Sequence, residues 1–294
     1  MTEETNWGSY ADISQCLDEW LTYSNGGRFT TSELWQEFNI RTDTAKKHLR
    51  DVLYSQIEKG TIERAGDKHF RRRRTELTPL NWAEADPNNH WDITTPLGLE
   101  RWIKWYPGVY LLAGATNSGK TGFFNDLIMC NYHKHDIHYF VSDMGEEEMR
   151  ERFELWREEH PSRYVPKPPK WSTWVRSCDF HDVVVADAFN IIDYLEVYDS
   201  FWEVAQQINQ IDTARGEKGI VFLGLQKKKG DDLGRGGSFS LEKPKAYFSM
   251  DFQKLKIQKS RARAKGGQNP NGLVIDFKLH RGARFEELGH TWPE

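Results

Sequence analysis

Cysteine is scarce in this chain, whose 294 residues include only Cys16, Cys130 and Cys178. The three lie far apart and show neither a Cys-x-x-Cys pair nor a Cys/His ligand spacing, which argues against a disulfide framework and a structural zinc site. Apolar runs approaching the roughly 20 residues that span a bilayer are also absent. The first residues are acidic and polar, where a signal peptide would be basic and then apolar. We therefore expect a cytoplasmic protein with no membrane partner.

A surplus of positive charge is missing as well, since 40 Lys and Arg residues stand against 44 Asp and Glu, giving a net charge of −4. The cations are nevertheless concentrated in residues 68–74, 227–229 and 254–265, and the acids in residues 146–159. Local basic patches can bind phosphate groups on a protein that is acidic overall. The net charge therefore does not exclude a nucleic-acid partner.

Residues 1–75 are predicted to form a small helical domain. A first helix is expected over residues 12–24, and a second after Thr30, whose hydroxyl can cap it while Glu33 completes a capping box. A third helix is indicated by apolar residues at helical spacing, and it ends at Gly60. Those apolar residues are Ala45, Leu49, Val52, Leu53 and Ile57.

A basic hairpin is expected after the third helix, with short strands over residues 61–64 and 68–71 and a run of four arginines at 71–74. The other face of the third helix carries Arg41, Lys46, Lys47, His48 and Arg50. Three helices followed by a basic hairpin resemble the winged-helix family, which implies a domain that binds duplex DNA. The alternative is a protein-interaction module of the same fold, in which the arginines are a solvated charge run.

Residues 76–107 are expected to be a linker that packs against another part of the protein, because proline, asparagine and tryptophan recur there without a clear period. From residue 108 to residue 294, short apolar strands alternate with helical stretches. The expected strands cover residues 109–113, 137–141, 190–193 and 220–225, and the expected helices cover residues 120–130, 146–158 and 202–214. Such alternation predicts an α/β fold with a mostly parallel sheet.

A phosphate-binding loop is expected between the strand at 109–113 and the helix after it, where the sequence matches GxxxxGK[ST]. The eight residues of this motif are Gly114, Ala115, Thr116, Asn117, Ser118, Gly119, Lys120 and Thr121. The glycines let successive backbone N–H groups point into one concavity, Lys120 reaches the β- and γ-phosphates, and the Thr121 hydroxyl coordinates magnesium. The motif predicts ATP and Mg²⁺ as cofactors.

A second acidic residue is expected to hold the magnesium ion through water, at the end of an apolar strand. Asp187 follows the apolar residues 183–186, and Asp193 follows residues 190–192. We favour Asp193, because a helix with apolar residues at helical spacing and then an apolar strand follow it.

Residues 96–286 resemble the RecA-like ATPase core, and within it the hexameric replicative helicases of the DnaB type. Beside the phosphate loop and the strand that ends at Asp193, the resemblance rests on Gln226 at the end of a strand and on Lys259 and Arg261 in a late strand. It implies that Gln226 senses the γ-phosphate and that Lys259 and Arg261 reach the nucleotide of a neighbouring subunit. It also implies a homo-oligomer, either a ring or a filament.

The catalytic carboxylate is the position at which this sequence departs from that family, which has Glu where Asp143 stands. A general base must reach the attacking water within about 3 Å or through one further water, and Asp is one methylene shorter than Glu. Three alternatives follow: Asp143 is the base, Glu146 replaces it, or the site binds ATP but hardly hydrolyses it.

The basic and glycine-rich residues 227–238 fall where RecA-like proteins place the loops that hold single-stranded DNA, and a solvated loop neutralised by Asp231 and Asp232 is the alternative. We therefore expect an ATP-dependent DNA-binding motor or DNA-loaded ATPase of the RecA/DnaB helicase type, acting in DNA replication or recombination. One alternative is a nucleotide-gated DNA-binding regulator or helicase loader with little hydrolysis. Another is a protein-interaction ATPase that contacts no nucleic acid.

Overall fold

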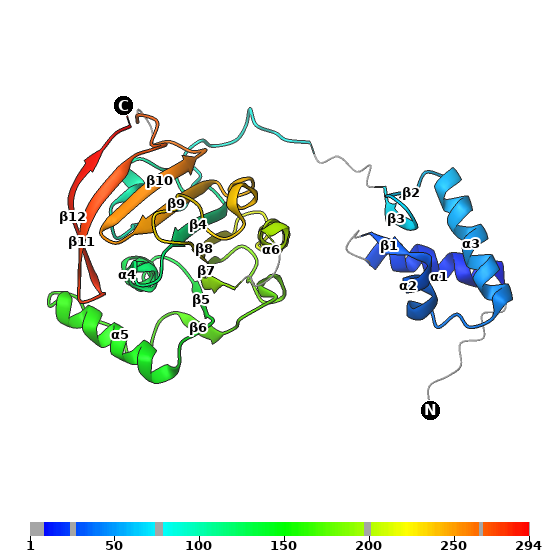
Figure 1. Cartoon of the computed structure of the whole chain (residues 1–294), viewed down its shortest axis with the longest axis horizontal. Helices are drawn as coiled ribbons and strands as arrows, with labels where there is room; N and C mark the ends of the chain where they lie inside the picture. Colours follow the sequence, from blue (N-terminus) through cyan, green and yellow to red (C-terminus); the bar gives the residue numbers. More distant parts are fainter. Residues whose placement is uncertain (1–8, 24–27, 74–78, 197–200, 265–266, 294) are drawn as a thin grey trace. The chain divides into compact units, whose positions relative to one another are not determined.

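The computed structural model describes the chain except for residues 1–8, 24–27, 74–78, 197–200, 265–266 and 294. The chain forms two compact units, Met1–Glu84 and Ala85–Glu294 (Figure 1). Each unit buries its own set of apolar side chains. Within the described residues, no helix has both the length and the apolar character needed to cross a bilayer.

The first unit packs three described helices against a small antiparallel sheet. The helices are α1 (Tyr10–Tyr23), α2 (Thr31–Glu37) and α3 (Asp43–Glu58). The strands lie in the order β1 (Phe29–Thr30), β3 (His69–Arg72), β2 (Ile62–Arg64). Most of the predicted apolar stripe is buried on α3, with Ile57 partly buried. The predicted end of the first helix at residue 24, and Arg74 of the arginine run, lie outside the described residues.

The capping box predicted for the second helix is present. The Thr30 side chain accepts from the backbone N–H of Glu33 over 3.2 Å, and Glu33 Oε2 accepts from the backbone N–H of Thr30 over 2.6 Å. Both bonds satisfy donors that a helix leaves without an intrahelical partner at its start. The Thr42 hydroxyl caps α3 in the same way, by accepting from the N–H of Ala45 over 3.2 Å.

A nine-stranded sheet forms the centre of the second unit, in the order β12-β11-β10-β9-β4-β8-β7-β5-β6. The strands are β4 (Gly108–Gly114), β5 (Ile137–Val141), β6 (Ser172–Val175), β7 (Phe189–Leu195), β8 (Ile220–Gln226), β9 (Ala246–Asp251), β10 (Lys254–Ser260), β11 (Val274–His280) and β12 (Arg284–Thr291). Neighbouring strands pair in parallel across one part of the sheet, which consists of β9, β4, β8, β7, β5 and β6. Strands β10, β11 and β12 add an antiparallel ribbon beside β9. The predicted α/β fold with a mostly parallel sheet is confirmed.

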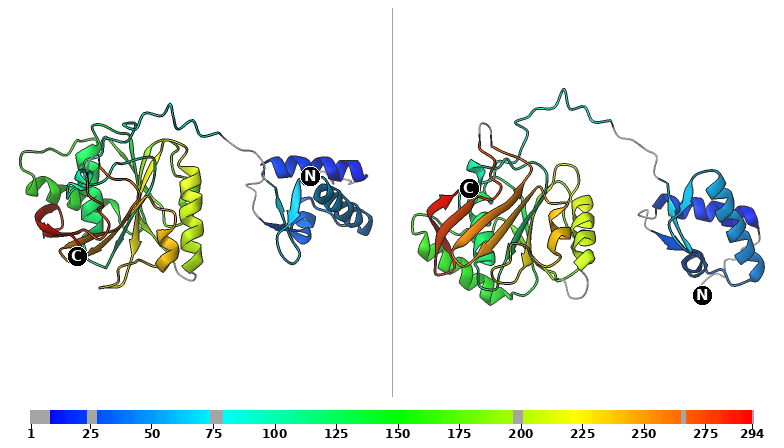
Figure 2. Two further views of the ribbon diagram at one scale, coloured as in Figure 1. Left: turned by 90° about the horizontal axis from the view of Figure 1, so that it is seen from above. Right: turned by 45° about the horizontal axis from the view of Figure 1, so that its top comes forward.

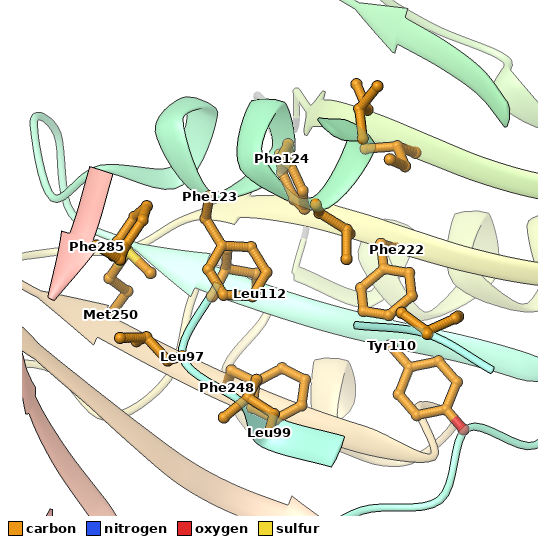
Figure 3. Packing of buried hydrophobic residues seen from close by; sticks show 14 of the residues in the cluster. Leu97, Leu99, Tyr110, Leu112, Phe123, Phe124, Phe222, Phe248, Met250 and Phe285 are labelled. Carbon is orange, nitrogen blue, oxygen red and sulfur yellow. The ribbon is translucent and has the colours of Figure 1, made fainter. Parts of the chain in front are cut away.

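Helices cover both faces of this sheet (Figure 2). On one face lie α4 (Lys120–Asn131) and α5 (Glu146–Glu159), and on the other α6 (Phe201–Ala214). Short 3₁₀ helices occur as η1 (Leu99–Arg101), η2 (Phe180–Asp182) and η3 (Gly237–Leu241). Figure 3 shows Phe123 and Phe124 of α4 packed toward the sheet, with Phe285 of β12 beside Phe123. The antiparallel ribbon therefore helps to fix the helix that follows the phosphate loop.

The stretch predicted as a linker over residues 76–107 divides differently in the structure. From Ala85 onward it belongs to the second unit. Trp105 is 2% exposed, and its carbonyl accepts from the N–H of Trp91 over 2.8 Å. Leu97 and Leu99 join the same cluster as α4 (Figure 3). Trp102 and Trp105 are core residues because their rings fill space beside the sheet, whereas Trp82 is 77% exposed.

Candidate functional site

The phosphate loop leaves the buried strand β4 at Gly114 and enters α4 at Lys120. Two of its positions require glycine. A Cβ at Gly114 would lie 2.5 Å from Cγ of Lys120 and 2.6 Å from Oγ of Ser118, and Gly119 has φ +104°, which side chains rarely adopt. The glycines thus allow the tight curl that brings backbone N–H groups to the start of α4.

Lys120 folds back over this loop. Its Nζ donates to the carbonyls of Gly114 and Ala115 over 2.9 Å and 3.2 Å. Burial lowers the pKa of Lys120, while the neighbouring Asp193 and Asp143 carboxylates act in the opposite direction. The lysine is therefore held at the mouth of the loop by carbonyl oxygens, which a phosphate oxygen can replace.

Asp193 lies in β7 and is 1% exposed. Burial raises the pKa of this carboxyl to about 6, against the lowering effect of hydrogen bonds from the Thr121 and Tyr139 side chains. The structure thus places Asp193 beside Thr121. Asp187 is at the opposite end of β7, where its Oδ1 accepts from the N–H of Lys218, and it takes no part in this site.

Gln226 and Asp143 both border the loop. Gln226 ends β8 directly opposite Gly114 of β4, and the next residue donates its backbone N–H to the Gly114 carbonyl over 3.1 Å. Asp143 follows β5, is exposed, and acts electrostatically on Lys120 and Asp193. Glu146, the alternative base, is exposed at the start of α5. Four strand ends therefore converge where the motif predicts a triphosphate.

The residues fit a Mg²⁺-bound triphosphate. Within the described part of the chain, the buried Oγ of Ser118 finds no hydrogen-bond partner, and it points into the loop region where Gly114 leaves no room for a Cβ. A hydroxyl, a buried ammonium and a row of N–H groups match phosphate oxygens. The Thr121 hydroxyl and the Asp193 carboxylate supply oxygen donors of the kind that Mg²⁺ prefers.

Lys227 was predicted as part of a basic loop that holds single-stranded DNA, and the structure corrects this for that residue. Its side chain is fully buried, with Nζ 2.7 Å from Oδ2 of Asp251 and 2.6 Å from the carbonyl of Asp231. Lys228 and Lys229 are exposed on the same loop. This ion pair could not be predicted from the sequence, because Asp251 is 24 positions away from Lys227.

Lys259 and Arg261 lie away from the phosphate loop of their own chain. Lys259 is in register with Tyr247, and through it with Leu111 of β4, and Arg261 bonds to the carbonyl of Lys245. Three or more residues of strand, roughly 10 Å or more at 3.3 Å per residue, separate this level from Gly114. Both side chains donate to the carbonyl of Glu242, and burial lowers the pKa of Lys259 to about 8.

The three described arginines of the hairpin, Arg71 to Arg73, all form contacts within the first unit. Glu63 forms an ion pair with Arg71, and its Oε2 lies 3.7 Å from Nε of Arg73. Arg72 donates to the carbonyl of Leu21 over 2.9 Å. On α3, by contrast, Lys47 and Arg50 are exposed.

Comparisons with known proteins found likenesses among solved structures. No protein-family model matches the chain, and no curated protein matches it. A KaiC-like protein, PH0186, from the hyperthermophilic archaeon Pyrococcus horikoshii OT3 has a TM-score of 0.49 and 16% identity, over 69% of this chain and 100% of that chain. The RadB recombinase has a TM-score of 0.48 and 12% identity, over 64% of this chain and 93% of that chain.

Proposed function

We propose that this chain is an ATP-dependent DNA-binding ATPase of the RecA-like kind, with DNA replication or recombination as its setting. One observation carries the proposal: Lys120, Thr121 and Asp193, which the sequence singled out separately, meet at one end of the sheet. A lysine, a hydroxyl and a carboxylate around a glycine-rich loop form the set of groups used in phosphoryl transfer.

The roles of these side chains follow from their chemistry. The N–H groups of residues 115–121 and the Lys120 ammonium bind and orient the β- and γ-phosphates, and Thr121 and Asp193 hold Mg²⁺, which neutralises charge on the phosphate oxygens when bound. Asp143 is the candidate that takes the proton from the attacking water, and Gln226 lies opposite Gly114, where it can contact the γ-phosphate.

DNA is the proposed partner at two surfaces. In the first unit, three helices and a three-stranded sheet support a winged-helix module, and the exposed Lys47 and Arg50 on α3 give it cations for duplex phosphates. In the second unit, Lys228 and Lys229 are exposed on the loop that begins directly after Gln226, which suits single-stranded DNA.

A nucleotide-gated DNA-binding regulator or helicase loader is the second candidate. It is favoured by Asp143, an exposed carboxylate one methylene shorter than the glutamate of the resembling family. Binding of ATP would then switch assembly while turnover stays slow.

ATP hydrolysis by the full chain, measured with and without single-stranded DNA, tests these proposals. A motor requires turnover that DNA stimulates, whereas the regulator requires DNA binding without stimulation. Lys120→Ala should abolish turnover and weaken ATP binding. A Lys228→Ala/Lys229→Ala variant is the matched control, which should keep its DNA-free rate and lose stimulation. ATP hydrolysis by Lys120→Ala at the wild-type rate would overturn the assignment of the site.

A further inference from the structure

A buried tyrosine beside the proposed magnesium site has no role in the function described so far. Tyr139 lies in β5 and is 0% exposed. Its hydroxyl donates to Oδ2 of Asp193 over 3.1 Å. We propose that Tyr139 is a positioning residue that fixes the Asp193 carboxylate for Mg²⁺, an inference that rests on the proposed nucleotide-binding function.

The main chain of Asp193 is already held from the same strand. Val141 of β5 is the register partner of Asp193, and the N–H of Ser142 donates to the Asp193 carbonyl over 3.0 Å. Tyr139 is two residues before Val141, so its side chain leaves β5 on the same face as that of Val141. Backbone and carboxylate of Asp193 are therefore both fixed by β5.

Hydroxyl groups lie near the carboxylate on two sides. Tyr139 approaches from the sheet, and the Thr121 side chain approaches from the first turn of α4. The terminal torsion of an aspartate is broad and would leave the two oxygens free to turn. With one oxygen held by the phenol, the carboxylate keeps a fixed orientation toward Thr121, the hydroxyl that the motif assigns to magnesium.

Packing alone does not account for a tyrosine at this place. A phenylalanine would fill the same volume without burying a hydroxyl, and burial of a hydroxyl costs free energy unless it forms a hydrogen bond. The adjacent Phe140, also buried, has no such group. The Tyr139 hydroxyl is satisfied by Asp193, and hydrogen bonds to the groups that bind a metal commonly change metal affinity by about 10- to 100-fold.

Magnesium dependence of nucleotide binding tests the proposal. We would titrate Mg²⁺ into the full chain with a fluorescent ATP analogue and compare wild type with Tyr139→Phe. The matched control is Tyr110→Phe: Tyr110 is 1% exposed, and its hydroxyl donates to the carbonyl of Tyr106 over 2.9 Å, away from Asp193. We expect the half-saturating Mg²⁺ concentration to rise about 10-fold in Tyr139→Phe and to stay at the wild-type value in Tyr110→Phe.

The outcomes separate this inference from the proposed function. An unchanged Mg²⁺ half-saturation in Tyr139→Phe, or an equal rise in Tyr110→Phe, overturns the positioning role while wild-type nucleotide binding still supports the site. If wild type does not bind the analogue, the proposed function fails and this inference fails with it. Circular dichroism checks the fold, and Tyr139→Leu, which also lacks the donor, replaces Tyr139→Phe in the titration if the latter does not fold.

Discussion

The buried carboxylate of Asp193 lowers the stability of the fold when it is ionised. Asp193 has a pKa of about 6 in the fold against 3.8 for the free group. An acid whose pKa is higher in the folded chain than in the unfolded chain destabilises the fold when it is ionised. The penalty is complete at a pH above the folded pKa and fades as the pH falls toward the unfolded pKa. At 1.36 kcal/mol for each unit, the penalty is on the order of 3 kcal/mol at pH 7.

Asp193→Asn should therefore stabilise the nucleotide-free chain at pH 7 while it removes the magnesium dependence of ATP binding. Thermal unfolding at pH 7 and near pH 3 measures the first effect, because the advantage of the variant should vanish below the unfolded pKa of the carboxyl. A variant that is less stable than wild type at pH 7 would show that the carboxylate is stabilising in the fold.

The ion pair between Lys227 and Asp251 predicts an asymmetry between its two partners. The Lys227 side chain is fully buried, whereas that of Asp251 is 35% exposed. Removing the partner of a buried charge costs about 3–5 kcal/mol, so Asp251→Asn should destabilise strongly. Lys227→Met should cost less, since the remaining carboxylate reaches water and the methionine fills the space.

Urea unfolding of both variants measures this difference. The matched control is Lys256→Met, which breaks the exposed pair with Asp232 at 2.9 Å and should change the free energy of unfolding by less than about 1 kcal/mol. Equal losses in Asp251→Asn and Lys227→Met would contradict the asymmetry.

The basic surface of the first unit should be centred on α3 and not on the hairpin. Each phosphate contact that a cation makes lowers the slope of log K against log[salt] by about 0.9. Lys47→Ala/Arg50→Ala in the full chain should therefore reduce the steepness of that slope by about 2. Equilibrium titration of a duplex at several salt concentrations measures it.

Glu63→Gln is the sharper variant on the hairpin. Glu63 pairs with Arg71 and Arg73, so its neutralisation should free both guanidinium groups and strengthen duplex binding. If wild type, Lys47→Ala/Arg50→Ala and Glu63→Gln all bind the duplex equally weakly at low salt, that result would favour a protein-interaction role for this unit.

Elements with local signals were predicted well, and those that depend on distant contacts were not. The capping box, the helix after the phosphate loop and the strand at 137–141 agree with α2, α4 and β5. The apolar run 183–186 was only a candidate strand beside the favoured 190–192, and in the structure it is not a strand: Val185 is 36% exposed, and Asp187 takes a left-handed φ of +57°. A short apolar run does not reveal whether both of its faces will be covered.

The same division holds within the candidate site. The phosphate loop is a contiguous motif, so each of its residues can be assigned from the sequence, and the pattern around Asp193 favours it over Asp187, which the structure places at the opposite end of β7. Tyr139 could not be assigned from sequence, since its partner is 54 positions away and a tyrosine is common in a buried strand. The burial of Lys227 could not be predicted, because a run of three lysines does not show which side chain turns inward.

The position of Lys259 and Arg261 bears on how copies of the chain would assemble. Lys259 is level with Leu111 in the middle of β4, and Arg261 lies nearer the end of the sheet away from the phosphate loop. We propose that any nucleotide they contact belongs to another copy. Cations supplied in this way contribute about 10³ to 10⁵ in rate in well-studied systems. Such head-to-tail contacts close into rings or continue as filaments.

Mixing two inactive variants tests this shared site. Lys120→Ala and Arg261→Ala should each lose ATP turnover, while an equal mixture should recover activity, since about a quarter of its head-to-tail interfaces combine an intact Lys120 with an intact Arg261. Lys120→Ala alone, at the same total concentration, is the control and should stay inactive. The mass of the oligomer in the presence of a nonhydrolysable ATP analogue shows whether assemblies form. Full activity of Arg261→Ala, or a dead mixture in which oligomers still assemble, would rule out a site completed by a neighbouring copy. Because Arg261 already donates to the carbonyl of Glu242, a recovered activity would also mean that this bond is exchanged for the nucleotide on assembly.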